Sequence, residues 1–238
     1  MAPPYTGTFE TGVNGAGVLS GDPGSATQWL EVNDPVNVTV TYSNIQAYQD
    51  LSCAITCDAT GGPGFVGWTP ATISPAYSGT HYGRIYGFFP SAPGALVFWV
   101  RGLESVSRAW ELRITTGMLI ELADNGGTQR GISTIAANTN AWFRVEWKVV
   151  QSTTAGVVEI KLFNDPDSVT PTETVTSTGS FSTLTTTDRL RFGSIATAVP
   201  NLLVYMDNIQ SNDTDYPGPF STVVAGNLAP VIYGRGAA

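Results

Sequence analysis

Apolar and polar residues alternate strictly along two neighbouring segments of the chain, residues 142–150 and 157–163. Such alternation predicts two strands that each bury one face. Slipping the pairing by one residue would turn the apolar face into water, and slipping it by two would bring like charges together. One register avoids both faults, and it pairs Val150 with Val157, Trp147 with Ile160, Lys148 with Glu159 and Glu146 with Lys161. We therefore expect a central antiparallel hairpin here.

Short segments of similar character recur along the chain, separated by turns rich in glycine and proline. The further strands that we expect are residues 34–42, 51–57, 80–89, 95–101, 110–114, 118–122, 129–135, 189–193 and 202–209. Residues 68–78 read as a loop, and residues 170–187 as an edge strand or a loop. About twelve strands without a helix predict an all-β protein, an antiparallel β-sandwich of jelly-roll type.

A second hairpin is expected at residues 110–122. Pairing Ile114 with Met118 leaves a three-residue loop that ends on Gly117, where such loops favour a left-handed residue. This register also places Glu111 opposite Glu121, with Arg113 as the cation nearby.

The chain shows no internal repeat and no linker before residue 213, so we expect a single domain over residues 1–213. Residues 214–238 differ because they are apolar, rich in turns and almost uncharged. They are expected either to pack back on the domain or to form an arm that becomes ordered on a neighbouring subunit. The residues expected to carry such an assembly arm are Tyr216, Phe220, Val223, Val224, Leu228, Val231, Ile232 and Tyr233.

Charge narrows the range of partners. Only 13% of the residues are charged and the net charge is -8, which weighs against nucleic acid or an anionic membrane as a partner. The N-terminal residues have neither a basic nor an apolar leader region, so we expect no secretory signal. Cys53 and Cys57 would lie about 13 Å apart on one strand, beyond disulfide reach, and are expected to be free buried thiols.

Four strand motifs carry a resemblance to a known family: Phe9-Glu-Thr-Gly12, Trp142-Phe-Arg-Val-Glu146, Arg191-Phe-Gly193 and Tyr205-Met-Asp-Asn-Ile209. Over residues 7–213 they resemble the concanavalin A-like lectin/glucanase superfamily, whose fold is a jelly-roll sandwich. The run from residue 207 to residue 219 also resembles the endings of jelly-roll proteins of bacteriophage particles, of the minor tail or capsid-associated kind.

Catalysis by a pair of carboxylates finds little support in the sequence. Glucanases of this superfamily carry a Glu-x-Asp-x-(x)-Glu strand motif, which is absent here. The substitute pair is Glu111 with Glu121, and we favour the alternative that Arg113 or water relieves their repulsion. His81 has no nucleophile motif around it and is expected to be structural, which we favour over a zinc site shared with Cys53 and Cys57.

We expect two candidate binding sites, one for a calcium ion and one for a sugar. The resemblance implies a structural calcium ion between the first and last strands, with Glu10 and Asp207 as ligands; a turn or capping role for Asp207 is the alternative. Trp29, Trp68 and Tyr77 lie in loop-like stretches and are candidates for stacking on sugar rings, or else for covering the core. The strand patterns assign Trp99, Trp110 and Trp147 to the core, whereas Trp142 begins a strand on its polar face and is left open.

These observations lead to one leading hypothesis and two alternatives. We expect a non-catalytic structural protein of the bacteriophage virion, either a capsid decoration protein or a minor tail protein, assembled in the host cytoplasm. Its expected partners are other virion proteins such as the major capsid or tail protein, further copies of itself and a host-surface glycan. A carbohydrate-binding module is the first alternative, and a glycoside hydrolase or lyase of the same fold is the second. No cofactor other than the calcium ion is expected.

Overall fold

The computed structural model describes residues 4–24, 27–179, 184–196 and 198–220 of the chain. Within these residues the chain forms nineteen strands, twelve of which have five residues or more, and no helix. The all-β, antiparallel prediction is therefore confirmed. The strands are β1 Tyr5–Gly7, β2 Pro23–Gly24, β3 Thr27–Gln28, β4 Glu31–Asn33, β5 Val38–Ser43, β6 Ser52–Cys57, β7 Gly64–Trp68, β8 Tyr77–Ser78, β9 Thr80–Phe88, β10 Val97–Glu104, β11 Ser107–Ile114, β12 Ile120–Asp124, β13 Gln129–Ile132, β14 Trp142–Val150, β15 Gly156–Phe163, β16 Glu173–Gly179, β17 Thr186–Thr187, β18 Arg189–Ser194 and β19 Leu203–Asn212.

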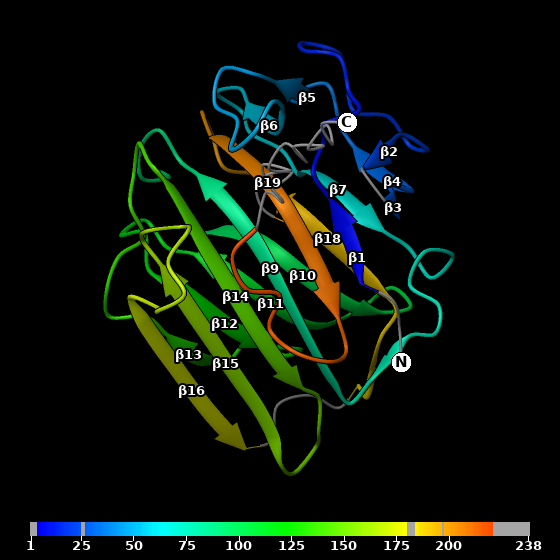
Figure 1. The fold of residues 1–238 in the computed structure, drawn as a ribbon, viewed down its shortest axis with the longest axis vertical. Coiled ribbons are helices and arrows are strands. Elements are labelled where there is room, and N and C mark those ends of the chain that lie inside the picture. The colour runs from blue at the N-terminus through cyan, green and yellow to red at the C-terminus, as the bar shows by residue number, and fades with distance from the viewer. Residues whose placement is uncertain (1–3, 25–26, 180–183, 197, 221–238) are drawn as a thin grey trace, which may run out of the picture.

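Two large antiparallel sheets lie one behind the other and form a sandwich (Figure 1). The eight-stranded sheet has the order β16-β15-β14-β9-β19-β6-β5, with β1 beside β19, and the seven-stranded sheet has the order β13-β12-β11-β10-β18-β7-β4. The pairs β2/β3 and β8/β17 are separate two-stranded sheets. No helix that could span a membrane occurs in the described part of the chain.

The hairpin formed by β14 and β15 has the register that the charges predict. Trp147 pairs with Ile160, Lys148 with Glu159 and Glu146 with Lys161. The hairpin is also central, because β14 pairs on its other side with β9. The polar face of β14 is buried rather than solvated, since the side chains of Arg144 and Glu146 are almost completely inaccessible.

The second hairpin, β11 with β12, differs from its predicted register. Ile114 pairs with Ile120 rather than with Met118, so the loop is two residues longer at that end, and Met118 rather than Gly117 has a positive φ, of 61°. Glu111 then lies opposite Ala123, and Arg113 lies opposite Glu121. The shift replaces a repulsive acid pair with an opposite-charge pair, which explains why this register is favoured.

Strand β7 is not predicted by the sequence pattern, because the glycine- and proline-rich residues 60–64 indicate a break in the chain and residues 68–78 indicate a loop. All five of its residues are buried, and β18 and β4 pair with it on either side. It is rich in glycine because the sheets come close there, and a Cβ on Gly64 would meet Val38 and Ile55. Such a strand lacks the branched and alternating residues by which strands are recognised in a sequence.

The core between the sheets is dominated by aromatic residues. Five of the six tryptophans, namely Trp29, Trp68, Trp99, Trp110 and Trp147, are fully buried. On β9, Gly83 leaves room for the ring of Trp147 from the adjacent strand β14, and Gly87 leaves room for the ring of Trp99 from β10 of the other sheet. Cys53 and Cys57 are buried free thiols, as predicted.

Candidate functional site

The aromatic residues predicted to bind sugars lie inside the core, so that prediction is wrong. Trp29 and Trp68 are completely buried and stack on each other, with ring centroids 5.2 Å apart and planes at 2°. Tyr77 is 1% exposed and packs against Tyr5 and His81. Their neighbours in the sequence are glycines, prolines and polar residues, which suggest a loop, but the rings point inward from short strands or beside them. Rings enclosed in this way cannot stack on a sugar.

Trp142, which the sequence left open, is the single tryptophan of the six that reaches the surface. It lies on the outer face of the eight-stranded sheet, at the start of β14. Its ring meets that of Tyr48 edge-on at 5.7 Å and that of Phe88 at 5.7 Å. The ring centroids of Tyr86 and Tyr48 lie 4.4 Å apart, and those of Tyr205 and Phe88 lie 5.9 Å apart. We call these residues the aromatic patch: Tyr48, Tyr86, Phe88, Trp142 and Tyr205. Trp142 and Tyr48 are its partly exposed members, and the other three rings are buried.

The loop that carries Tyr48, residues 44–51, is held by two acids, the buried Asp207 and the partly buried Glu10. Asp207 Oδ2 accepts a hydrogen bond from the main-chain N–H of Tyr48 (3.2 Å), and Glu10 Oε2 accepts one from Leu51 (3.1 Å). The Tyr48 hydroxyl donates to Asp167. Burial raises the pKa of Asp207 well above its usual value, and the charge of Glu10 raises it further. The two acids hold the loop in place, in the manner of the turn or capping role considered for Asp207.

Glu10 and Asp207 do come together, as the calcium expectation requires. Their oxygens are largely used, however, because both oxygens of Asp207 accept main-chain N–H groups, those of Tyr48 and Asn208. Glu10 Oε1 is buried without a hydrogen-bond partner among the described residues. Calcium takes six to eight oxygen ligands, and no group of three or more potential ligating side chains occurs within the described part of the chain. The two carboxylates fall short of such a set, and the calcium ion stays a prediction.

The segment that follows β19, residues 213–220, folds back over the outer face of the eight-stranded sheet (Figure 1). We call it the strap. The Tyr216 hydroxyl donates to Glu159 (2.7 Å), and the ammonium of Lys161 lies 3.5 Å from the centre of the Tyr216 ring. The main-chain N–H of Phe220 donates to the hydroxyl of Tyr86 (2.6 Å).

Tyr216 and Phe220, two of the residues expected in an assembly arm, are thus half-buried on their own domain. The other expected arm residues, Val223, Val224, Leu228, Val231, Ile232 and Tyr233, lie outside the described residues.

The polar face of β14 lies among the strap, the turn after β15 and the neighbouring strands. Arg144 is fully buried, and its Nε lies 3.1 Å from Glu146 Oε1. Its guanidinium lies over the ring of Phe163 and donates to the carbonyls of Pro166 and Ser168. Glu146 therefore forms its ion pair along its own strand, with Arg144, and not across the hairpin with Lys161.

A pocket of about 450 Å³ lies between the strap and the strands β1, β9 and β19. The polar residues that line it are Thr6, Thr8, Gln49, Arg84 and Gln210, and Phe220 is among the apolar ones. It adjoins the aromatic patch, because Gln49 follows Tyr48 in the chain and the guanidinium of Arg84 lies 5.6 Å from the centre of the Tyr86 ring.

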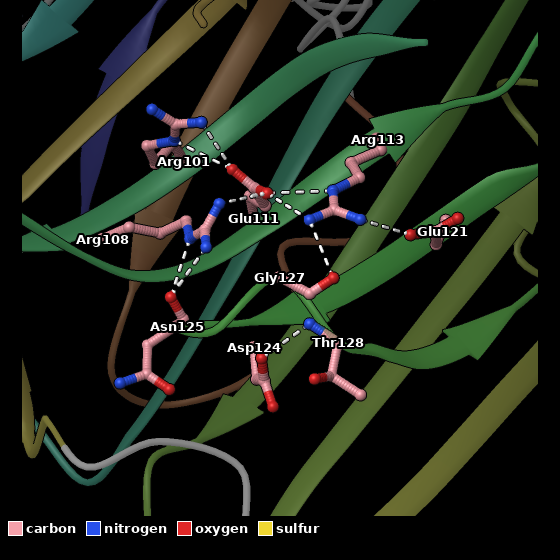
Figure 2. Close-up of polar contacts among 9 residues, drawn as sticks. All are labelled: Arg101, Arg108, Glu111, Arg113, Glu121, Asp124, Asn125, Gly127 and Thr128. Atoms are coloured by element: carbon pink, nitrogen blue, oxygen red, sulfur yellow. Dashed lines mark hydrogen bonds and ion pairs between the residues drawn. The ribbon is translucent and has the colours of Figure 1, made fainter.

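The carboxylates considered for catalysis belong to an ion-pair network on the outer face of the other sheet (Figure 2). The side chain of Glu111 is fully buried among three guanidinium groups, which donate to it from Arg101 (2.6 Å), Arg108 (3.0 Å) and Arg113 (2.5 Å). Arg113 also donates to Glu121 at 2.7 Å. Relief of the two acids by Arg113 is the alternative that the sequence favoured, and it leaves neither of them placed as a nucleophile with a partner acid.

His81, the other candidate for chemistry, is completely buried in the core between the rings of Tyr77 and Trp110. It belongs to no cluster of potential metal ligands in the described ranges. This placement agrees with the structural role expected for it.

The fold and this arrangement of side chains define an all-β antiparallel sandwich. No family model and no curated protein matches the sequence. Among solved structures, the receptor-binding domain of botulinum neurotoxin type G is similar at 10% identity and a TM-score of 0.49, over 88% of this chain and 49% of that one. The ligand-binding domain of serotype D in complex with N-acetylneuraminic acid is similar at 12% identity and a TM-score of 0.47, over 90% of this chain and 49% of that one.

A Trypanosoma rangeli sialidase is similar at 12% identity and a TM-score of 0.47, over 77% of this chain and 28% of that one. The chain thus spans about half of these domains or less. Likenesses of this degree concern the chain trace and do not carry a function over to this protein.

Proposed function

We propose that this protein is a non-catalytic β-sandwich module that contacts glycans through its aromatic patch and is displayed on the surface of a bacteriophage particle. One observation carries the glycan part of the proposal. Five tryptophans are enclosed in the core, and the sixth, Trp142, lies at the surface with Tyr48 beside it. Trp142 packs on a small buried cluster of Ala54, Phe88 and Tyr205 and stays partly exposed, and tryptophan and tyrosine in such half-exposed positions are enriched at binding interfaces.

The geometry of the patch suits a sugar ring. Trp142 and Tyr48 meet at 73°, so they form two walls of a corner against which the apolar face of a pyranose can pack. Aromatic rings supply a large contact area with few rotatable bonds, which limits the entropy lost on binding.

Tyr48 is also held before any ligand arrives. Asp207 fixes its main chain and Asp167 accepts a hydrogen bond from its hydroxyl. Preorganisation of this kind increases affinity because less freedom is lost when the complex forms.

The virion part of the proposal rests on the resemblance of residues 207–219 to the endings of jelly-roll proteins in phage particles. The particle role is that of a capsid decoration protein or a minor tail protein, and the partners are other virion proteins. The ionic partners of Glu111 and Glu121 support the non-catalytic character, since each acid is held by arginine.

A glycan array tests the glycan part, with the wild type, Trp142→Ala and a matched control, Val106→Ala. Val106 is 77% exposed in the turn between β10 and β11, so this control also removes exposed apolar surface, but from the other sheet. We expect retention of glycans by the wild type and the control, and about tenfold weaker binding or worse for Trp142→Ala. Wild-type binding by Trp142→Ala, or no retained glycan on the array, would contradict the proposal. Circular dichroism of all three proteins checks that they are folded.

A further inference from the structure

Arg84 is a buried cation that forms no ion pair with the described residues. It is 4% exposed, and its Nε and Nη1 donate to the main-chain carbonyls of Asn208 (3.1 Å) and Gly218 (2.7 Å). Burial lowers the pKa of Arg84, as expected of a charge removed from water. The charge of Glu146 opposes this lowering of the pKa, but Glu146 forms its ion pair with Arg144. Burying a charge is costly unless an opposite charge compensates it.

The space beside Arg84 is large enough for a ligand. The pocket measures about 450 Å³, within the roughly 300–1,000 Å³ of small-molecule sites. Hydrogen-bonding side chains of Thr6, Thr8, Gln49 and Gln210 line it together with apolar rings such as Phe220. A few polar groups within an apolar wall are typical of a site that fixes the orientation of a small ligand.

Arg84 is the charged group among the described lining residues, which suits a group with a single negative charge. A guanidinium is a strong hydrogen-bond donor to a carboxylate, and Nη2 of Arg84 is the nitrogen that donates to neither the Asn208 carbonyl nor the Gly218 carbonyl. The pocket lies next to the aromatic patch, because the Tyr86 ring is close to both Arg84 and Tyr48. We infer that the pocket binds the carboxylate of an acidic sugar, with Arg84 as the anion-binding residue and the aromatic patch alongside the rest of the glycan. The assignment to a sugar rests on the proposed function, whereas the assignment to a carboxylate does not.

Titration of the full chain with D-glucuronate, D-glucose and acetate, followed by NMR chemical shifts, tests this inference. Glucuronate and glucose differ in having a carboxylate or a hydroxymethyl group at the same carbon, and acetate supplies the carboxylate alone. The variants are Arg84→Gln and Gln210→Glu. The second places a carboxylate inside the pocket without changing the shape of the side chain, and it leaves Arg84 in place if Arg84→Gln fails to fold. The control is Arg189→Gln, which removes a partly exposed arginine from β18 of the other sheet.

We expect saturable binding of glucuronate, weaker binding of acetate and no binding of glucose. Both pocket variants are expected to weaken glucuronate binding by about 10- to 100-fold, the effect of losing a charge-assisted hydrogen bond, and the control is expected to leave it unchanged. Equal binding of glucose and glucuronate, or wild-type affinity in the pocket variants, would overturn the inference. Acetate binding as tightly as glucuronate would overturn the sugar assignment and leave the carboxylate assignment standing.

The outcome is independent of the glycan array. Glucuronate binding that persists in Trp142→Ala supports the pocket even if the aromatic patch binds no sugar. Retention of neutral glycans without any binding of glucuronate supports the patch and removes the pocket.

Discussion

At the scale of single residues, His81 shows how burial sets the charge of a side chain. Its ring lies 5.3 Å from Tyr77 and 5.0 Å from Trp110, and neither ring nitrogen has a hydrogen-bond partner among the described residues. Desolvation lowers the pKa of His81 from 6.5 to about 3. The folded protein therefore keeps this histidine neutral at all ordinary pH values.

This burial predicts a pH-dependent stability. Below pH 6.5 the unfolded chain binds a proton that the folded protein excludes, so the free energy of unfolding falls as the pH decreases toward about 3. Between pH 7 and pH 4.5 the wild type is expected to lose about 2–3 kcal/mol more than His81→Phe, which cannot titrate. Urea unfolding of both proteins at the two pH values measures this difference. Since the acidic groups titrate in both proteins, equal losses would contradict the prediction.

The sequence correctly predicted the burial of residues in strongly alternating strands. It also correctly predicted a structural position for His81, which has no nucleophile motif around it. Trp99, Trp110 and Trp147 follow the apolar faces of their strands and are buried, as expected. Trp29 and Trp68 could not be placed in this way, because their neighbours alternate weakly and their burial depends on contacts with residues far away in the chain, such as Phe192.

At the scale of elements, the two hairpins show when charge decides a register. In β14 and β15 the charges alternate in sign, so a single pairing satisfies them all, and the structure has that pairing. Between β11 and β12, Gly117 predicts a three-residue loop that ends on it. The structure uses a longer loop because it lets Arg113 face Glu121. The arginines that surround Glu111 come from β10 as well as β11, a contact that no local pattern shows.

The network around Glu111 predicts a large loss of stability when its charge is removed. Glu111→Gln leaves three guanidinium groups close together without their shared anion, and we expect the free energy of unfolding to fall by about 3–5 kcal/mol. The matched control is Glu159→Gln, whose side chain is 24% exposed and pairs with Lys161; it is expected to cost about 1 kcal/mol or less. Urea unfolding at neutral pH compares them, and similar losses for the two variants would show that the network contributes little.

At the scale of the whole molecule, the strap ties the end of the described chain to the outer face of the eight-stranded sheet. Its contacts include those of Tyr216 with Glu159 and of Gly218 with Arg84. The sequence left two outcomes for this region, packing back or binding a neighbour, and residues 213–220 take the first. The assembly-arm hypothesis now concerns residues 221–238 alone and stays a prediction.

Deletion of residues 221–238 tests that hypothesis. The variant retains the core and every strap contact described above, so we expect an unchanged melting temperature. If the segment attaches the protein to its particle, the variant is expected to be lost from purified virions, as measured by mass spectrometry. Incorporation equal to that of the wild type would contradict the arm hypothesis, and a folded variant that is absent from particles would support it.

The sequence by itself determined the all-β class, the central hairpin with its register and the burial of the strand tryptophans. These features follow from periodicity and charge within a few residues of chain. Only the tertiary structure decided that β7 is a strand, that Trp142 is the tryptophan at the surface, and that Arg84 is buried beside a pocket. These depend on how distant strands and the strap pack together, and such contacts leave no local periodic signal.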